Sequence, residues 1–174
     1  MSETASGTVA VVVGNPKPAS RTLVAATYVA RELTGREPEL VVDLATLGPA
    51  LLDWSDPGVA GLVDQVGKAG LVVAASPTYK GAYTGLLKLF LDRFAGGTGL
   101  TGVAVPLLLG GSPAHSLAPE LTLRPVLTEI GATVPVRGLY VLDSQYDDPA
   151  AYDAWLGAAR PVVSALTSRT GVAS

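Results

Sequence analysis

Apolar residues fall into five short runs rich in valine and leucine, separated by longer stretches in which apolar positions recur every three or four residues. Short continuous apolar runs are typical of strands buried on both faces of a parallel sheet, and the longer spacing indicates amphipathic helices. The pattern predicts strands at residues 8–13, 40–44, 71–75, 103–109 and 133–142. It predicts helices at 20–33, 59–68, 86–94, 117–130 and 148–167, with a turn-rich connection at 45–57.

The strands and helices alternate along the whole chain. This order predicts an α/β fold with three layers, in which helices cover both faces of a five-stranded parallel sheet. The natural strand order for such a chain is 2-1-3-4-5, the flavodoxin-like arrangement. A length of 174 residues suits a single domain, so we expect residues 1–174 to form one flavodoxin-like domain.

Prolines mark two predicted irregularities. Pro106 lies inside the fourth strand, where it removes a ladder hydrogen bond, so we expect a bulge or irregular pairing there. Pro119 and Pro125 lie in the fourth helix, and an internal proline predicts a kink or a π-type bulge.

The loop after the first strand is a candidate anion site. Ser20 is placed to cap the following helix, and Arg21 and Thr22 come directly after it. A helix N-terminus with hydroxyl and guanidinium groups can bind a phosphate dianion. An ordinary capping serine with solvated neighbours explains the loop equally well. The loop matches neither the dinucleotide-binding nor the P-loop glycine pattern, which argues against both of those phosphate grips.

The loops after the third and fourth strands suit a flat ligand. The former offers backbone N–H groups, an aromatic face and small residues at Pro77, Thr78, Tyr79, Lys80, Gly81 and Ala82. The latter begins with two glycines that allow close approach of a ring, and its candidate residues are Gly110, Gly111, Ser112 and His115. In the 2-1-3-4-5 order, the carboxyl ends of strands 1, 3 and 4 meet at one crevice. We therefore expect the three loops to form one ligand site.

Composition excludes several function classes. The net charge of −3 and the pI of about 5.0 argue against nucleic-acid binding. The chain has no cysteine and one histidine, which excludes thiolate catalysis and His- or Cys-rich metal sites. No basic start precedes an apolar leader, and no apolar run is long enough for a membrane span, so a cytoplasmic location is expected. Hydrophobic residues form 48% of the chain and charged residues 16%, an excess that suggests burial against another subunit.

These segments together resemble a known family. The sequences NPKPASRT at 15–22 and SPTYKGAYTGLLK at 76–88 carry most of the likeness, with GGSPAH at 110–115, LRPVL at 123–127 and DSQ at 143–145. They resemble the NAD(P)H-dependent FMN reductases, and most closely the reductases of two-component alkanesulfonate-type monooxygenases. The resemblance implies that Ser20, Arg21 and Thr22 bind the FMN phosphate. It also implies that residues 77–82 border the isoalloxazine ring, with Gly110, Gly111, Ser112 and His115 on its other side.

The implied chemistry is hydride transfer from NADPH or NADH to N5 of FMN, with no catalytic side chain required. The implied partners are the nicotinamide nucleotide, free flavin, a flavin-dependent monooxygenase and other copies of the chain in a homodimer or homotetramer. Leu121 stands where related reductases can carry an aromatic residue, at a π-helical position linked to subunit contact. Arg124 and the fourth helix are the first candidates for that interface.

Other functions are compatible with the same fold. One is an oxidoreductase that retains FMN and reduces quinones, azo dyes or metal ions. A second is a flavodoxin-type electron carrier, which the mild net charge and the form of the phosphate loop disfavour. A third is an interaction module without catalysis, which three converging loops disfavour. The sequence separates neither retained from released FMN nor NADH from NADPH, because Lys17, Arg21 and Lys80 could each meet a 2′-phosphate.

Overall fold

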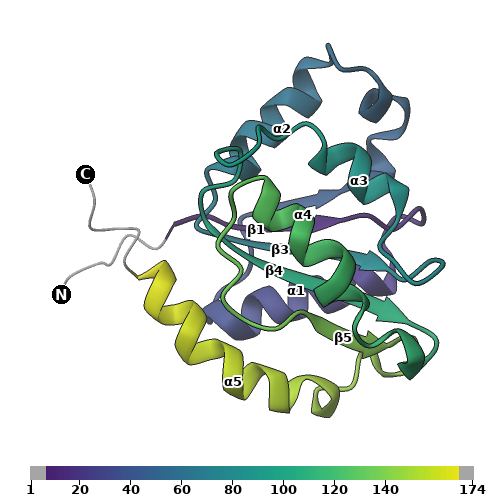
Figure 1. The fold of residues 1–174 in the computed structure, drawn as a ribbon, viewed down its shortest axis with the longest axis vertical. Helices are drawn as coiled ribbons and strands as arrows, with labels where there is room; N and C mark the ends of the chain where they lie inside the picture. Colours follow the sequence, from purple (N-terminus) through teal and green to yellow (C-terminus); the bar gives the residue numbers. More distant parts are fainter. Residues whose placement is uncertain (1–6, 169–174) are drawn as a thin grey trace.

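The five apolar runs form one parallel sheet. A computed structural model describes residues 7–168, and its strand order is β2-β1-β3-β4-β5, as predicted. All four strand pairs are parallel, and their arrows point to the same side of the molecule (Figure 1). The strands are β1 (Val9–Val13), β2 (Leu40–Asp43), β3 (Leu71–Pro77), β4 (Val103–Gly110) and β5 (Leu139–Leu142). The predicted flavodoxin-like order is therefore confirmed.

Helices cover both faces of this sheet. One face carries α1 (Arg21–Thr34) and α5 (Ala150–Thr167), and the other carries α2 (Pro57–Gly67), α3 (Gly85–Leu91) and α4 (Arg124–Glu129) (Figure 1). Alternate strand residues supply the two cores. In β1, Val9, Val11 and Val13 pack toward α1 and α5, whereas Ala10 and Val12 face the other helices. Burial on both faces explains why the strands read as continuous apolar runs.

Polar side chains fix where the helices begin. Ser20 caps α1 by accepting a hydrogen bond from Leu23 N, and Thr84 caps α3 by accepting one from Leu87 N. Each cap satisfies one of the amide groups that a first helical turn leaves without a partner. Because both capping residues follow the carboxyl end of a strand, both helices begin at the same edge of the sheet.

The predicted irregularity at Pro106 is wrong. The pairing of β3 with β4 runs without interruption through Ala74 and Pro106. The reason lies on the other side of β4, where Ala104 N donates to Thr133 O. Amide groups two residues apart point the same way, so the missing N–H of Pro106 faces a stretch that lies before the start of β5. Its absence costs no bond to a neighbouring strand.

The fifth strand is shorter than predicted. Residues 133–142 were expected to pair, but β5 spans only Leu139–Leu142, and an isolated bridge joins Thr133 to Val103. Pro135 cannot donate a ladder bond. The Arg124 guanidinium instead bonds the carbonyl groups of Val134 and Val136. A side chain from a neighbouring helix therefore satisfies the backbone of this segment.

The fourth helix contains the predicted π-type irregularity. Residues Pro119–Leu123 form the π-helical segment η4, which leads directly into α4. Glu120 Oε1 accepts from Arg124 Nε at 2.6 Å, and its Oε2 accepts from Gly138 N at 2.6 Å. Arg124 thus bonds within the chain to Glu120 and to the segment before β5, and its expected place at an interface stays a prediction. Leu121 points outward and is 68% exposed.

The described residues contain neither a membrane-spanning helix nor a cluster of metal-ligating side chains. Within residues 7–168, none of the helices combines the length and the apolar character that crossing a membrane requires. The same part of the chain contains no group of three or more His, Cys, Asp or Glu residues that could hold a metal ion.

Candidate functional site at the carboxyl edge of the sheet

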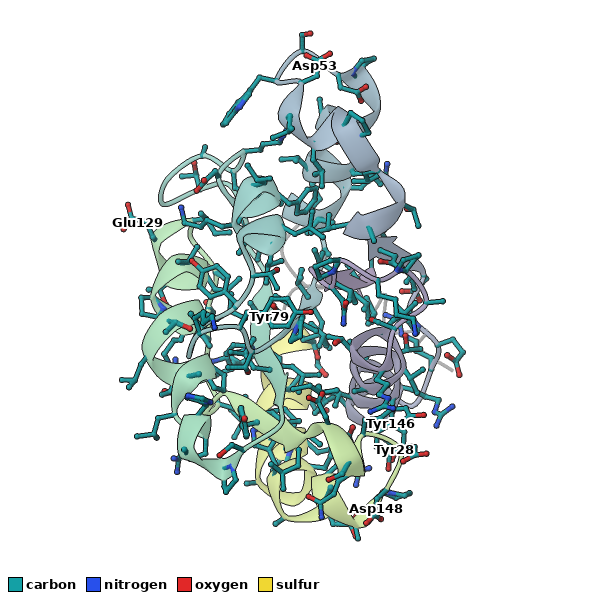
Figure 2. The ribbon with its side chains drawn as sticks, turned by 90° about the vertical axis from the view of Figure 1, so that its right-hand side faces the viewer. Tyr28, Asp53, Tyr79, Glu129, Tyr146 and Asp148 are labelled. Atoms are coloured by element: carbon teal, nitrogen blue, oxygen red, sulfur yellow. The ribbon has the colours of Figure 1, made fainter. Side chains whose placement is uncertain are left out.

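A cavity of about 370 Å³ lies at the carboxyl edge of the sheet. Figure 2 views the molecule from the side to which the strands point, with Tyr79 near the middle of the view. The cavity joins the loop after β1, the start of α1, the end of β3 and the segment η5 (Asp143–Gln145) after β5. Its lining residues are Asn15, Lys17, Ala19, Ser20, Arg21, Thr22, Pro77, Tyr79 and Asp143.

The loop after β1 is shaped by its own polar groups and by β2. Asn15 Oδ1 accepts from Lys17 N at 2.9 Å, and Asn15 Nδ2 donates to Thr22 Oγ1 at 3.0 Å. Ala19 adopts a left-handed φ of 51°, and its N–H donates to Asp43 Oδ2 at 2.9 Å. Left-handed backbone is unfavourable for alanine, so these bonds offset the strain that brings the chain to Ser20.

Hydrogen-bond donors remain unused at the start of α1. Ser20 and Thr22 are buried, and each hydroxyl oxygen accepts a bond, from Leu23 N and Asn15 Nδ2 respectively. Neither hydroxyl donates to any residue between 7 and 168, and Arg21 forms no ion pair there. The backbone N–H groups of Arg21 and Thr22, in the first turn of the helix, also have no backbone acceptor among the described residues. Such a set of donors fits an anion rich in oxygen atoms.

The loop after β3 contains a tight hairpin turn. Tyr79 and Ala82 exchange two backbone hydrogen bonds, of 2.9 and 3.2 Å, and the two residues between them have positive φ values of 54° at Lys80 and 79° at Gly81. Positive φ at both central positions defines a type I′ turn. The turn leaves the Tyr79 side chain 54% exposed at the cavity. The backbone of this loop is therefore preset rather than flexible in conformation.

A buried hydroxyl pair ties that loop to the first strand. Thr84 N donates to Ser76 Oγ at 2.9 Å, and Thr84 Oγ1 donates to Gly14 O at 2.5 Å. A side chain at Gly14 would overlap Leu87 of α3, since its Cβ would lie 2.4 Å from that residue's Cβ. The ends of β1 and β3 and the start of α3 are consequently held in direct contact.

The loop after β4 adjoins the turn on its other side. Thr78 N donates to Leu109 O at 2.7 Å, and the His115 ring lies against Gly81, where an added Cβ would be 3.7 Å from Cδ2. His115 ends the short 3₁₀ helix η3 (Pro113–His115), whose start is capped by Ser112.

Tyr140 of β5 fixes the start of this loop. Its hydroxyl donates to Ser112 O at 2.7 Å and fills the space beside Gly110, where a Cβ would lie 2.0 Å from it. Burial raises the pKa of Tyr140, against the opposing effect of the bond to Ser112. The Thr78 hydroxyl lies beside that of Tyr140, but it is buried and forms no hydrogen bond of good geometry with any described residue. The Tyr140 hydroxyl thus leaves no room for a side chain at Gly110, whereas Gly111 has nothing within 4 Å of its Cβ position.

The structure brings the predicted residues together at one edge but not into one cavity. Of the predicted residues, five line the cavity: Ser20, Arg21, Thr22, Pro77 and Tyr79. The others belong to the adjoining turn and the loop after β4: Thr78, Lys80, Gly81, Ala82, Gly110, Gly111, Ser112 and His115. The first two loops therefore form the cavity, and the third extends the same edge beyond the turn.

Three residues that shape this edge were not predicted to belong to the site. Asn15 organises the first loop, Asp143 places a carboxylate at the cavity, and Tyr140 anchors the loop after β4. Asp143 carries a usable signal, because it directly follows the fifth strand, as the chosen loops follow theirs. Tyr140 carries none, since it lies inside a strand and its partners are distant in the sequence.

Comparison with known proteins places this edge of the sheet in a family context. The model of the family described as NADPH-dependent FMN reductase matches residues 8–147. The FMN reductase (NADPH) of Escherichia coli K12 is 31% identical over 144 residues, which cover 80% of this chain and 75% of that protein. The NADH-dependent FMN reductase SfnF of Pseudomonas fluorescens is 31% identical over 136 residues, covering 74% of this chain and 73% of the relative.

The chain is also similar to a solved structure of an FMN oxidoreductase. The apo form of the NADH:FMN oxidoreductase EMOB superposes with a TM-score of 0.82 at 31% identity, over 92% of this chain and 90% of that one. The matched region runs from β1 to just beyond η5 and so contains every loop of the edge described above. This chain belongs to the NADPH-dependent FMN reductase family.

Proposed function

We propose that this enzyme transfers hydride from NADPH or NADH to FMN and releases the reduced flavin to a separate flavin-dependent monooxygenase. Family membership supports the first half of this proposal. The likeness of the loops at 15–22 and 76–88 to the reductases of two-component alkanesulfonate-type systems supports the second half. We also propose a cytoplasmic location for the enzyme, and we propose that residues 1–174 act as one flavin-binding domain.

The observation that carries the proposal is the set of unused donors at the start of α1. The hydroxyl groups of Ser20 and Thr22, the Arg21 guanidinium and the first helical amides converge on the 370 Å³ cavity. A phosphate monoester offers three terminal oxygen atoms, and the positive end of the helix dipole favours its charge. These residues fit the phosphate of FMN and would hold it there.

The neighbouring loops suit the ring of the same molecule. Pro77 and Tyr79 border the cavity, and we assign the type I′ turn through Ala82 to one edge of the isoalloxazine. The buried Thr78 hydroxyl, which forms no hydrogen bond of good geometry with a described residue, would be available to a polar ring atom. Gly111, Ser112 and His115 would lie on the other side. Bound FMN supplies the hydride-accepting atom, and the chain's own groups orient the flavin and leave one face open to nicotinamide.

The charges around the cavity favour a flavin that leaves. Lys17 and Arg21 attract a phosphate dianion, whereas Asp143 at the same cavity repels it. Tyr79, 54% exposed, leaves the ring site open to solvent. A moderate affinity is what a reductase needs if FMN is its substrate rather than its permanent cofactor.

We also propose that the chain assembles as a homodimer or homotetramer through the face formed by α3 and α4. A depression of about 390 Å³ lies between these helices, with Leu91, Phe94 and Val126 in its lining. Leu89 and Leu121 on this side of the fold are exposed by 37% and 68%. Burial of such apolar side chains is a common driving force for association.

Turnover with free flavin tests the proposed function. Flavin-free protein is given NADPH or NADH, and the initial rate of nucleotide oxidation is measured while FMN is titrated from below to above the enzyme concentration. The proposal predicts rates that continue to rise, and then saturate, at FMN concentrations well above that of the enzyme. A rate that reaches its limit at one FMN per chain and requires an added quinone identifies retained FMN and contradicts release. No oxidation of either nucleotide contradicts the reductase activity itself.

A further inference from the structure

The Arg21 side chain is held by an aromatic ring instead of an oxygen atom. Its guanidinium carbon lies 5.4 Å from the centre of the Tyr146 ring, and it forms no ion pair with any residue described between 7 and 168. Asp143 lines the same cavity but does not bond to Arg21. In contrast, five other arginines have oxygen partners: Arg31 and Arg36 form ion pairs, and Arg93, Arg124 and Arg160 donate to carboxylate or carbonyl oxygens.

This arrangement has a physical consequence for anion binding. A cation over the face of a tyrosine ring is attracted by the ring quadrupole, and the ring face offers the guanidinium no oxygen acceptor. The five N–H donors of arginine lie in the plane of that group and are not consumed by the ring. Tyr146 can therefore fix the direction of the Arg21 side chain and leave its donors free for a ligand.

The backbone of Tyr146 is anchored to α5. Its backbone carbonyl accepts a hydrogen bond of 2.6 Å from the Tyr152 hydroxyl, and Tyr152 is 1% exposed. The Tyr152 ring packs edge-on against Tyr28 of α1 at 4.9 Å between centroids. Burial raises the pKa of Tyr152 to about 12, so its hydroxyl remains a donor at any physiological pH. Figure 2 shows Tyr28 and Tyr146 together on one side of the molecule, beside the start of α1.

We propose that Tyr146 is a positioning residue that orients Arg21 for binding the phosphate monoester of the flavin. The inference rests on the proposed function, because it requires that FMN binds with its phosphate at the start of α1. Tyr146 does not line the cavity, so its effect would reach the flavin through the Arg21 guanidinium.

Flavin affinity tests this role, with riboflavin as the probe that lacks the phosphate. Dissociation constants for FMN and riboflavin are measured by flavin fluorescence in wild type, Tyr146→Leu and Tyr146→Phe. We expect Tyr146→Leu to weaken FMN about three- to fivefold and to leave riboflavin unchanged. Tyr146→Phe retains an aromatic face and is expected to bind both flavins as wild type does.

A matched control variant and an Arg21→Gln background test whether Tyr146 affects FMN affinity through Arg21. Trp54→Leu removes a comparable pair outside the cavity, since Arg93 lies 5.3 Å from the Trp54 ring centre, and it is expected to leave FMN affinity unchanged. In an Arg21→Gln background, Tyr146→Leu is expected to have no further effect on FMN. An additional loss in that background, or an equal loss for riboflavin, means that Tyr146 acts on the fold and overturns the proposal.

The source of the phosphate is tested in parallel. If the Arg21 site binds the 2′-phosphate of NADPH, Tyr146→Leu raises KM for NADPH but not for NADH and leaves the FMN dissociation constant unchanged, which overturns the proposal. The proposed function is tested separately in the wild-type protein. Equal affinity for FMN and riboflavin, or an absence of NAD(P)H oxidation, would contradict it. A wild type that prefers FMN, together with a Tyr146→Leu variant that behaves as wild type, rejects the Tyr146 role alone.

Discussion

At the scale of single residues, the paired glycines after β4 serve different purposes. Both were predicted to make room for a flat ligand, but Gly110 makes room for the Tyr140 hydroxyl, and Gly111 alone faces open space. The sequence predicts that both glycines lie at the end of a strand, where ligands bind in such folds. It does not reveal their different surroundings, because the residue that fills the space beside Gly110 lies 30 positions away in the chain.

Two alanine substitutions, each of which adds one methyl group, test this difference between the glycines through its effect on stability. Gly110→Ala is expected to lower the free energy of unfolding by about 3 kcal/mol, since its Cβ would lie 2.0 Å from Tyr140 Oη. Gly111→Ala serves as the matched variant and is expected to change stability by less than about 1 kcal/mol. Urea denaturation of the two flavin-free variants compares them. Equal destabilisation contradicts the packing described for Tyr140.

The carboxylate of Asp143 leads to a second prediction at this scale. Asp143→Asn removes a negative charge from the cavity assigned to the phosphate, so FMN is expected to bind about two- to fivefold more tightly, with riboflavin unchanged. Asp153→Asn, an equal charge change on the exposed side of α5, is the control. Fluorescence titration at low salt measures both. Weaker FMN binding in Asp143→Asn shows that this carboxylate supports the flavin and contradicts a repulsive role.

At the scale of elements, the sequence predicts β1 to β4 and their helices well because their information is local. Apolar runs and capping residues such as Ser20 and Thr84 mark where elements start and end. The start of β5 is different. The run at 133–142 looks like a strand, but the carbonyl groups of Val134 and Val136 are bonded by Arg124 of a preceding helix. Long-range contacts of this kind are invisible to periodicity.

The Glu120 carboxylate makes the stability of this irregular segment depend on pH. Burial by itself would raise the pKa of Glu120, but its bonds from Gly138 N and Arg124 outweigh that effect and lower it. A carboxyl group with a lowered pKa stabilises the fold above its unfolded value of about 4.3, and this contribution is lost as the pH falls through the folded value. Glu120→Gln is therefore expected to destabilise by about 1–2 kcal/mol at pH 7.

Urea denaturation at pH 7 and below pH 4 checks the effect. The gap between wild type and Glu120→Gln should narrow in acid, because the wild-type carboxyl then becomes protonated. Glu129→Gln, an exposed glutamate on α4 without a hydrogen bond from its side chain to a described residue, should match wild type at both pH values. A gap that stays constant from neutral to acidic pH contradicts the role given to the Glu120 charge.

At the scale of the whole molecule, the order of the parallel strands brings the loops of the site together. Parallel strands end at one edge, so loops that are distant in sequence lie side by side, and three loops chosen by residue type are found at that edge (Figure 1). The sequence could predict this gathering from the strand order. It could not predict that the type I′ turn at Lys80 and Gly81 separates the cavity from the loop after β4.

Assembly belongs to the same scale. Leu121→Glu places a charge on the proposed self-association face and is expected to shift the assembly toward monomer in light-scattering measurements of mass. Leu52→Glu is matched in exposure, because both leucines are 68% exposed, and it should leave the mass unchanged. A mass reduced by Leu52→Glu and retained by Leu121→Glu contradicts the use of the α3 and α4 face.

The phosphate site at the start of α1 is the central feature of the proposed function. Its most direct test is the affinity of the wild-type chain for FMN and for riboflavin, measured by fluorescence titration of flavin-free protein in the same buffer. Unused donors at Ser20, Arg21 and Thr22 predict that FMN binds at least about tenfold more tightly, at one flavin per chain, and that this advantage shrinks with added salt. Equal affinities for the two flavins would contradict the placement of the phosphate and with it the site proposed for this enzyme.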